Sequence, residues 1–175
     1  TMLGLSKVAL LGATMAVLPD DLKLYGTLNN KLGGAIDLTD EIDVVNPKHN
    51  IFDEVTAAES HAGLKDYRCI YIKNESATSK LKNAMVFIEI PPTDSQVHIY
   101  IGRSPGKGTP ALISTDQEVP AGVAFQRADD IEHAVQLGNI GPGDSVPIWL
   151  KRSIEAGSKT GQVNIFVITV LGDTD

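Results

Sequence analysis

Short runs of β-forming residues, each followed by a turn signal, recur along this chain and constrain its fold more than any other feature. In residues 96–102, the apolar Val97, Ile99 and Ile101 alternate with more polar residues, as in a strand with one buried face. Runs of this kind at intervals of about ten residues predict an all-β fold, an antiparallel β-sandwich of the jelly-roll or Ig-like type. The five clearest runs span residues 66–74, 83–90, 96–102, 146–152 and 163–171.

Weaker signals account for the rest of the domain, which we expect to begin at residues 22–25. Residues 35–45 predict an edge strand, because acidic side chains lie between apolar ones and charges on an open edge oppose unwanted pairing. We expect a loop or one short helix over residues 50–62, and short strands over residues 120–125 and 134–137. The acidic side chains of the expected edge strand are Asp37, Asp40, Glu41 and Asp43.

The segment before Pro19 is mostly apolar, and five of its apolar residues recur at near-helical spacing. It is too short and too interrupted for a membrane span, which needs about 20 apolar residues, so we expect no membrane partner. We expect residues 1–20 to form a helix or an extended arm that docks on a neighbouring protein, and residues 21–175 to form the β-sandwich domain. An uncleaved leader peptide is the alternative. The five candidate contact residues are Leu5, Val8, Leu11, Met15 and Leu18.

Charge and cysteine content exclude some classes of function. The chain has 175 residues, which suits one domain, and a net charge of −7, whereas a protein that binds duplex DNA usually carries a basic face. We therefore expect no direct contact with nucleic acid. Cys69 is the only cysteine, so neither an internal disulfide nor a cysteine zinc site can form. Its position in an apolar run predicts a buried thiol.

Two segments invite comparison with known binding motifs. Residues 102–109 look like a phosphate-binding loop, but Gly108 follows Lys107 where that loop requires Ser or Thr. We therefore predict exposed loops at residues 103–110 and 138–144, and regard both as candidate binding loops. An acidic cluster lacks the spacing of a calcium loop and predicts a solvated loop. Its members are Asp129, Asp130, Glu132 and His133.

No residue is assigned a catalytic role, and we expect neither a cofactor nor a metal ion. The histidines form no H-x-x-x-H pair, and no G-x-S-x-G motif is present. Glu89 or Glu132 could pair with another carboxylate for glycoside hydrolysis, but a sugar-cleaving cleft usually carries several aromatic platforms and the aromatic content here is 5%. Trp149 lies in an alternating run, which predicts a core position. The histidines are His49, His61, His98 and His133, with His98 on the polar side of its run.

Several segments together resemble a group of small virion structural proteins of tailed bacteriophages. The resemblance covers roughly residues 21–175, and its motifs are turns and strands in a fixed order, so they carry no active site to transfer. The segments are Leu22–Tyr25, Leu32–Ile36, Asn50–Gly63, Asp66–Asn74, Leu137–Asp144 and Ile148–Arg152.

The resemblance implies a non-enzymatic role on the virion. We expect a capsid decoration or cement protein on the surface of the head, bound to the major capsid protein and homo-oligomeric, with a trimer favoured. The apolar arm would then add affinity in the assembled shell. One alternative is a tail, collar or fibre-associated module that binds a host surface carbohydrate. Another is a secreted β-sandwich hydrolase, which would need a pocket with convergent titratable groups.

Overall fold

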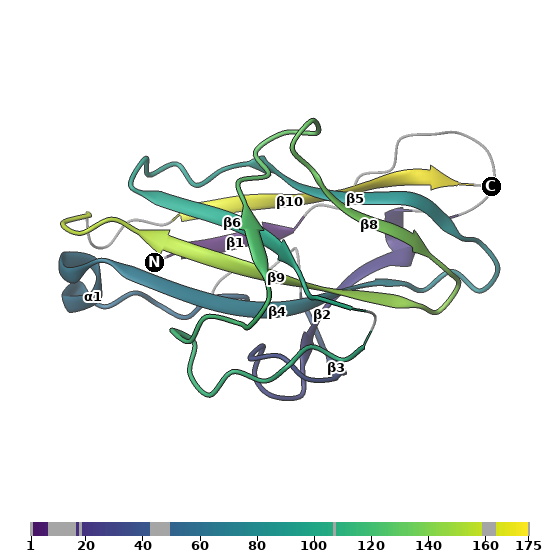
Figure 1. Ribbon diagram of the computed structural model, residues 1–175. Helices are drawn as coiled ribbons and strands as arrows, with labels where there is room; N and C mark the ends of the chain where they lie inside the picture. The colour runs from purple at the N-terminus through teal and green to yellow at the C-terminus, as the bar shows by residue number, and fades with distance from the viewer. Residues whose placement is uncertain are drawn as a thin grey trace.

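The computed structural model describes residues 2–6, 17, 19–42, 50–106, 108–158 and 164–174, with backbone alone for residues 2–6 and 164. These residues form ten strands in two packed sheets (Figure 1). The strands are β1 (Met2–Ser6), β2 (Leu22–Thr27), β3 (Ile36–Glu41), β4 (Leu64–Asn74), β5 (Leu81–Ile90), β6 (Val97–Arg103), β7 (Ala124–Gln126), β8 (Val135–Ile140), β9 (Ser145–Ile154) and β10 (Asn164–Thr174). A 3-10 turn, η1 (Pro19–Asp21), and a short helix, α1 (Ala57–Ala62), complete the described elements.

The strand order confirms the predicted antiparallel β-sandwich. One sheet has the order β1-β10-β5-β8 and the other the order β3-β2-β4-β9-β6-β7. Neighbouring strands pair in antiparallel fashion, with the exception of β1, which runs parallel to β10. Each of the five clearest predicted runs forms a strand, and β10 lies inside its sheet with β1 on one side and β5 on the other.

Strand alternation divides the buried residues between two cores. In β4, Ile70 and Ile72 point into the main core between the sheets, whereas Tyr67 and Cys69 belong to a second, smaller cluster. Trp149 of β9 lies in this smaller cluster and is 1% exposed, which confirms its predicted core position. The six-stranded sheet is therefore packed on both of its faces.

One predicted edge strand is confirmed, and a second predicted strand is confirmed only in part. β3 is an edge strand, as expected, and its Asp40 and Glu41 pair with Lys31 and Lys23; Asp43 lies outside the described residues. The strand expected over residues 120–125 is confirmed only from Ala124 onward. Residues 120–123 form a turn, with Gly122 at φ 72° and a hydrogen bond from the Val123 amide to the Pro120 carbonyl.

The segment before Pro19 is described only at Met2–Ser6 and at Val17. Met2–Ser6 adopt the extended one of the two expected conformations, because their backbone groups pair with β10 of the same chain in the register Met2↔Asn164 to Ser6↔Ile168. This part of the expected arm is thus a strand of the sandwich. Val17, which was not among the candidate contact residues, is 2% exposed and belongs to the main core.

The short helix α1 confirms one of the two alternatives for residues 50–62. Thr56 begins it with a capping box: its hydroxyl accepts a hydrogen bond from the Glu59 amide, and the Glu59 carboxylate accepts one from the Thr56 amide. No helix within the described residues is long and apolar enough to cross a membrane.

Candidate functional site

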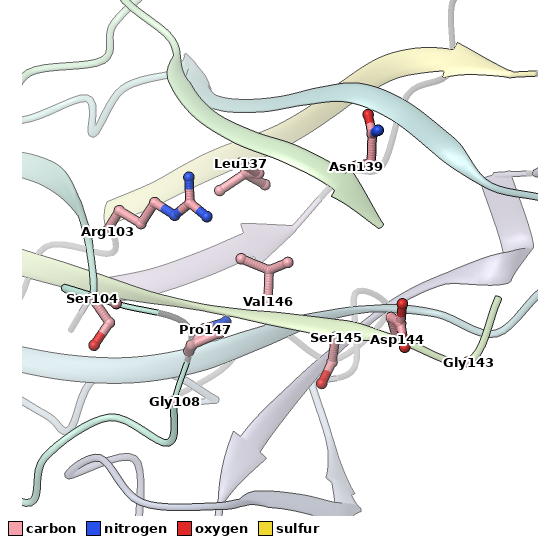
Figure 2. Close-up of a pocket in the computed structure, with 11 residues that line it drawn as sticks. Arg103, Ser104, Gly108, Leu137, Asn139, Gly143, Asp144, Ser145, Val146 and Pro147 are labelled. Atoms are coloured by element: carbon pink, nitrogen blue, oxygen red, sulfur yellow. The ribbon is translucent and has the colours of Figure 1, made fainter. Parts of the chain in front are cut away.

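Parts of the two segments predicted to be exposed loops meet at one hollow on the side of the sandwich. The prediction for residues 138–144 is wrong for its first part, because residues 138–140 belong to β8 and Ile140 is buried; residues 141–144 connect β8 to β9. The hollow has a volume of about 500 Å³ and lies where β8 of one sheet passes β9 of the other. Figure 2 shows Leu137 of β8 and Val146 of β9 pointing toward each other across it. It is lined by Arg103, Ser104, Gly106, Gly108, Leu137, Asn139, Gly143, Asp144, Ser145, Val146 and Pro147.

The chemistry of this hollow fits hydrogen bonding better than catalysis. Arg103 and Asp144 are the only charged side chains among its described lining residues. The Arg103 guanidinium donates to the Gln136 carbonyl over 3.3 Å, and the Asn139 side chain accepts from the Asn83 amide over 3.0 Å. Among the described lining residues there is no histidine, cysteine or glutamate, and Asp144 is the one carboxylate beside the serines.

A lobe built from two loops covers the outer face of the six-stranded sheet. We call this lobe, formed by residues 28–35, 104–106 and 108–123, the loop lobe; in Figure 1 it lies at the bottom, beside β3. The Cys69 amide donates to the Lys31 carbonyl over 2.6 Å, and the Tyr67 amide donates to the Asp116 carbonyl over 2.7 Å. The pairing of β4 with β2 ends at Tyr71. Beyond this point, carbonyls of the two loops accept the hydrogen bonds of the backbone amides on that edge of β4.

The two loops of the lobe are also bonded to each other. The Ile113 amide donates to the Leu32 carbonyl, and the Gly34 amide donates to the Pro110 carbonyl, each over 3.0 Å. Gly34 has φ 84°, and a Cβ there would lie 2.5 Å from the Asn29 side-chain nitrogen and 3.0 Å from Leu112. Glycine is therefore required at this turn for both conformation and space.

The loop lobe buries one set of apolar side chains and exposes another. Inside it, Ile113 packs with Trp149 and Cys69, and the tyrosine and phenylalanine rings of Tyr67 and Phe125 lie 5.4 Å apart. Outside it, Leu28 is 66% exposed and Leu112 is 60% exposed. Such exposure costs hydrophobic free energy that a partner surface could recover. On the neighbouring β3, Leu38 is 59% exposed.

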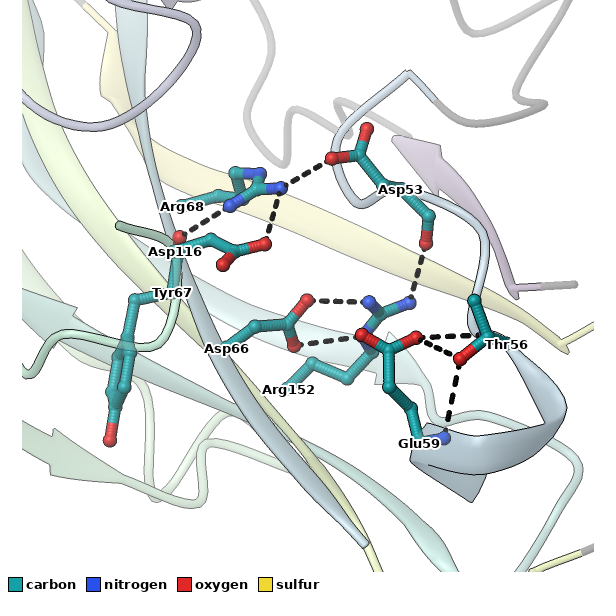
Figure 3. A network of polar contacts seen from close by, with 8 residues as sticks. All are labelled: Asp53, Thr56, Glu59, Asp66, Tyr67, Arg68, Asp116 and Arg152. Atoms are coloured by element: carbon teal, nitrogen blue, oxygen red, sulfur yellow. Dashed lines mark hydrogen bonds and ion pairs between the residues drawn. The ribbon is translucent and has the colours of Figure 1, made fainter. Parts of the chain in front are cut away.

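A buried ionic network fixes the opposite face of β4 to its surroundings (Figure 3). Arg152 of β9 donates to both carboxylate oxygens of Asp66 and to the Asp53 carbonyl, and its guanidinium lies 4.7 Å from the Phe52 ring centre. Burial raises the pKa of Asp66, although the hydrogen bonds and charge of Arg152 oppose this shift. Side chains this deeply buried hold the strands in register and are not accessible to a ligand.

A second arginine links this network to the loop lobe. Arg68 is 3% exposed and donates to the Asp53 carboxylate over 2.8 Å and to the Asp116 carboxylate over 3.2 Å. Asp116 belongs to the loop lobe, and Asp53 precedes α1. One buried cation therefore ties both segments to β4.

The other residues that the sequence singled out occupy ordinary structural positions. Burial raises the pKa of the Cys69 thiol to about 12, so this thiol stays protonated at neutral pH. The Asp130 carboxylate accepts hydrogen bonds from the His133 amide and ring, which lower its pKa. Among the residues that the structure describes, no group of three or more His, Cys, Asp or Glu side chains is placed to hold a metal ion. His98 is partly buried and contacts Glu155 over 3.1 Å.

The predicted contact residues of the arm are only partly within the described structure. Leu5 lies in β1, at the register position of Val167. Val8, Leu11, Met15 and Leu18 lie outside the described residues. The predicted exposed loop at residues 103–110 covers only one part of the loop lobe. Its turn-rich sequence does not indicate which leucines are exposed, because that depends on how the two loops pack on the sheet.

Comparisons with known proteins do not assign this chain to a family. No protein-family model and no curated protein matches it. One solved structure with partial similarity is that of AvmM, which catalyses macrocyclization in alchivemycin A biosynthesis. The two are 11% identical over 63% of this chain and 81% of that chain, with a TM-score of 0.28. Similarity at this level carries no argument about the function of this chain.

Proposed function

We propose that this chain is a non-enzymatic structural protein of a phage virion, a decoration protein bound to the outer surface of the head. The resemblance of residues 21–175 to small virion proteins of tailed bacteriophages motivates this role. The structural observation that supports it is the loop lobe, a braced projection that exposes Leu28 and Leu112.

The bracing of the loop lobe suits it to binding a fixed surface. Backbone hydrogen bonds join the lobe to β4 and join its two loops to each other, and the Arg68 guanidinium donates a hydrogen bond to the Asp116 carboxylate of the lobe. A preordered projection loses little conformational entropy when it docks. Burial of an exposed leucine at a partner surface contributes about 1.5–3 kcal/mol, so two leucines can dominate the affinity of each copy.

The test is rebinding of purified protein to phage heads that lack it. We expect the wild-type chain to saturate the heads, and the double variant Leu28→Glu/Leu112→Glu to bind at least tenfold more weakly, because each substitution places a charge at the interface. Ile131→Glu is the matched control. Ile131 is 54% exposed, but it lies in the loop between β7 and β8, on the other side of the molecule in Figure 1. Wild-type protein that fails to bind such heads would exclude the decoration role.

A carbohydrate-binding module of the tail, collar or fibre is the second candidate. One observation favours it: the polar hollow between residues 103–108 and 137–147, where Arg103, Asp144 and two serines could hydrogen-bond sugar hydroxyls. None of its described lining residues is aromatic, so it lacks the stacking platform common in sugar sites. A glycan array separates the two candidates, because this alternative requires specific hits that Asp144→Ala abolishes.

A further inference from the structure

The described edges of the two sheets differ in how they are protected against pairing. β3 carries Asp37, Asp40 and Glu41, and β7 is only three residues long. On β8, the Gln136 carbonyl accepts a hydrogen bond from Arg103, and the Ile140 carbonyl accepts one from Asn74 over 3.1 Å. Charges and short length are among the usual protections of an edge.

The remaining described edge is formed by β1, which carries no charged residue. β1 has the sequence Met-Leu-Gly-Leu-Ser, and among the described strands it pairs with β10 alone. β10 in turn offers an apolar run to this edge, in which Phe166, Val167 and Ile168 are at most 4% exposed. Without β1, the edge of β10 would be long, apolar and open, which is a hazard for aggregation.

No local connection determines which copy of the chain supplies β1. Parallel strands cannot be joined by a tight hairpin, and β1 lies at the opposite end of the sequence from β10. Ten residues separate Ser6 from Val17, which is anchored in the main core. A chain of this length spans at most about 36–40 Å when extended.

We propose that copies of this chain exchange β1, so that Met2–Ser6 of one copy complete the sheet of the next at its β10. The exchanged and unexchanged forms have the same strand pairing, so the balance between them depends on the concentration of neighbouring copies and on the linker. Strand exchange joins copies into a homo-oligomer without a new contact surface. This inference does not depend on the proposed virion role, since β1 could exchange in any oligomer of the chain.

Disulfide trapping in the register of β1 and β10 tests the exchange. Leu3 and Ile165 are register partners, so cysteines at these positions lie within disulfide range. Two chains with different tags, one carrying Leu3→Cys and the other Ile165→Cys, are coexpressed and oxidised. We expect a disulfide-linked heterodimer on a denaturing gel. The native Cys69 is buried and does not compete.

The control keeps the same chemistry and shifts the register. Leu5→Cys with Ile165→Cys places the two Cα atoms about 8 Å apart, beyond the reach of a disulfide. No heterodimer is expected from this pair. Exchange is contradicted if the mixed single variants give no heterodimer while the double variant Leu3→Cys/Ile165→Cys forms a disulfide within one chain. Rebinding to phage heads is measured in a separate experiment. A negative result in the disulfide experiment therefore does not bear on the proposed virion role, and a negative rebinding result does not bear on strand exchange.

Discussion

Asp66 and Arg152 are direct cross-strand partners on β4 and β9, and their carboxylate and guanidinium groups form a two-pronged ion pair inside the sandwich. Both side chains are 1% exposed. Two of the longest strands of the six-stranded sheet are therefore joined by charge as well as by backbone hydrogen bonds.

Removal of one partner of this pair should be severely destabilising. We expect Asp66→Ala to lower the free energy of unfolding by about 3–5 kcal/mol, because it removes the carboxylate whose charge compensates the buried Arg152 cation. The double variant Asp66→Leu/Arg152→Met should recover most of this loss, since it removes both charges. Urea denaturation of the three proteins measures the effect. A loss below 1 kcal/mol for Asp66→Ala would show that solvent reaches Arg152.

Tyr71 should make the protein sensitive to alkali. Its hydroxyl donates to the Gly34 carbonyl over 2.9 Å, and burial raises its pKa to about 12. The folded state thus holds the phenol proton more tightly than the unfolded state, whose pKa is near 10. This contribution to stability is complete below pH 10 and is lost as the pH rises through about 12.

The variant Tyr71→Phe isolates that contribution. It should cost about 1 kcal/mol at pH 8, because the hydrogen bond is lost. Its stability should also fall less than that of the wild type between pH 10 and pH 12. Tyr100→Phe, on β6 and half-buried, is the control for the removal of a tyrosine hydroxyl at another site. Equal pH slopes for wild type and Tyr71→Phe would contradict this role.

The Cys69 thiol should be inert in the folded protein. Burial raises its pKa to about 12, so almost no thiolate exists at neutral pH to attack an alkylating reagent. We expect no labelling of the native protein over hours and complete labelling in urea. Rapid stoichiometric labelling of the native protein would mean that the loop lobe opens readily.

The capping box of α1 should stabilise the protein most when Glu59 is ionised. Hydrogen bonds from the Thr56 amide and hydroxyl lower the pKa of Glu59. Its contribution is therefore complete above the ordinary glutamate pKa and is lost as the pH falls through the lowered value. Thr56→Ala should cost about 1 kcal/mol at pH 7. Glu59→Gln should weaken the dependence of stability on pH below 5, as measured by thermal denaturation across pH.

The sequence predicts the sandwich well because alternation is a local signal. Val97, Ile99 and Ile101 show the buried face of β6 without any knowledge of its neighbours. The acidic residues of β3 are also a local signal. They predict a strand at the edge of a sheet, since charged side chains are disfavoured in the protein interior.

Features that depend on distant parts of the chain are not predictable in this way. Apolar spacing before Pro19 leaves a helix and an extended arm open, and the backbone of Met2–Ser6 is extended because β10, more than 150 residues away, supplies its hydrogen bonds. Likewise, Arg68 and Arg152 are polar residues in strands, and only the fold brings Asp53, Asp66 and Asp116 to them. The hollow between β8 and β9 depends on the packing of two sheets, although both loops at its rim are evident in the sequence.

The most direct measurement of the proposed role is electron cryo-microscopy of the virion that carries this chain. The proposal predicts that the two-sheet fold fits repeated density on the outer surface of the head, with the loop lobe against the major capsid protein. Density for the fold confined to the tail, collar or fibres, or no copy of the chain in the purified particle, would contradict it.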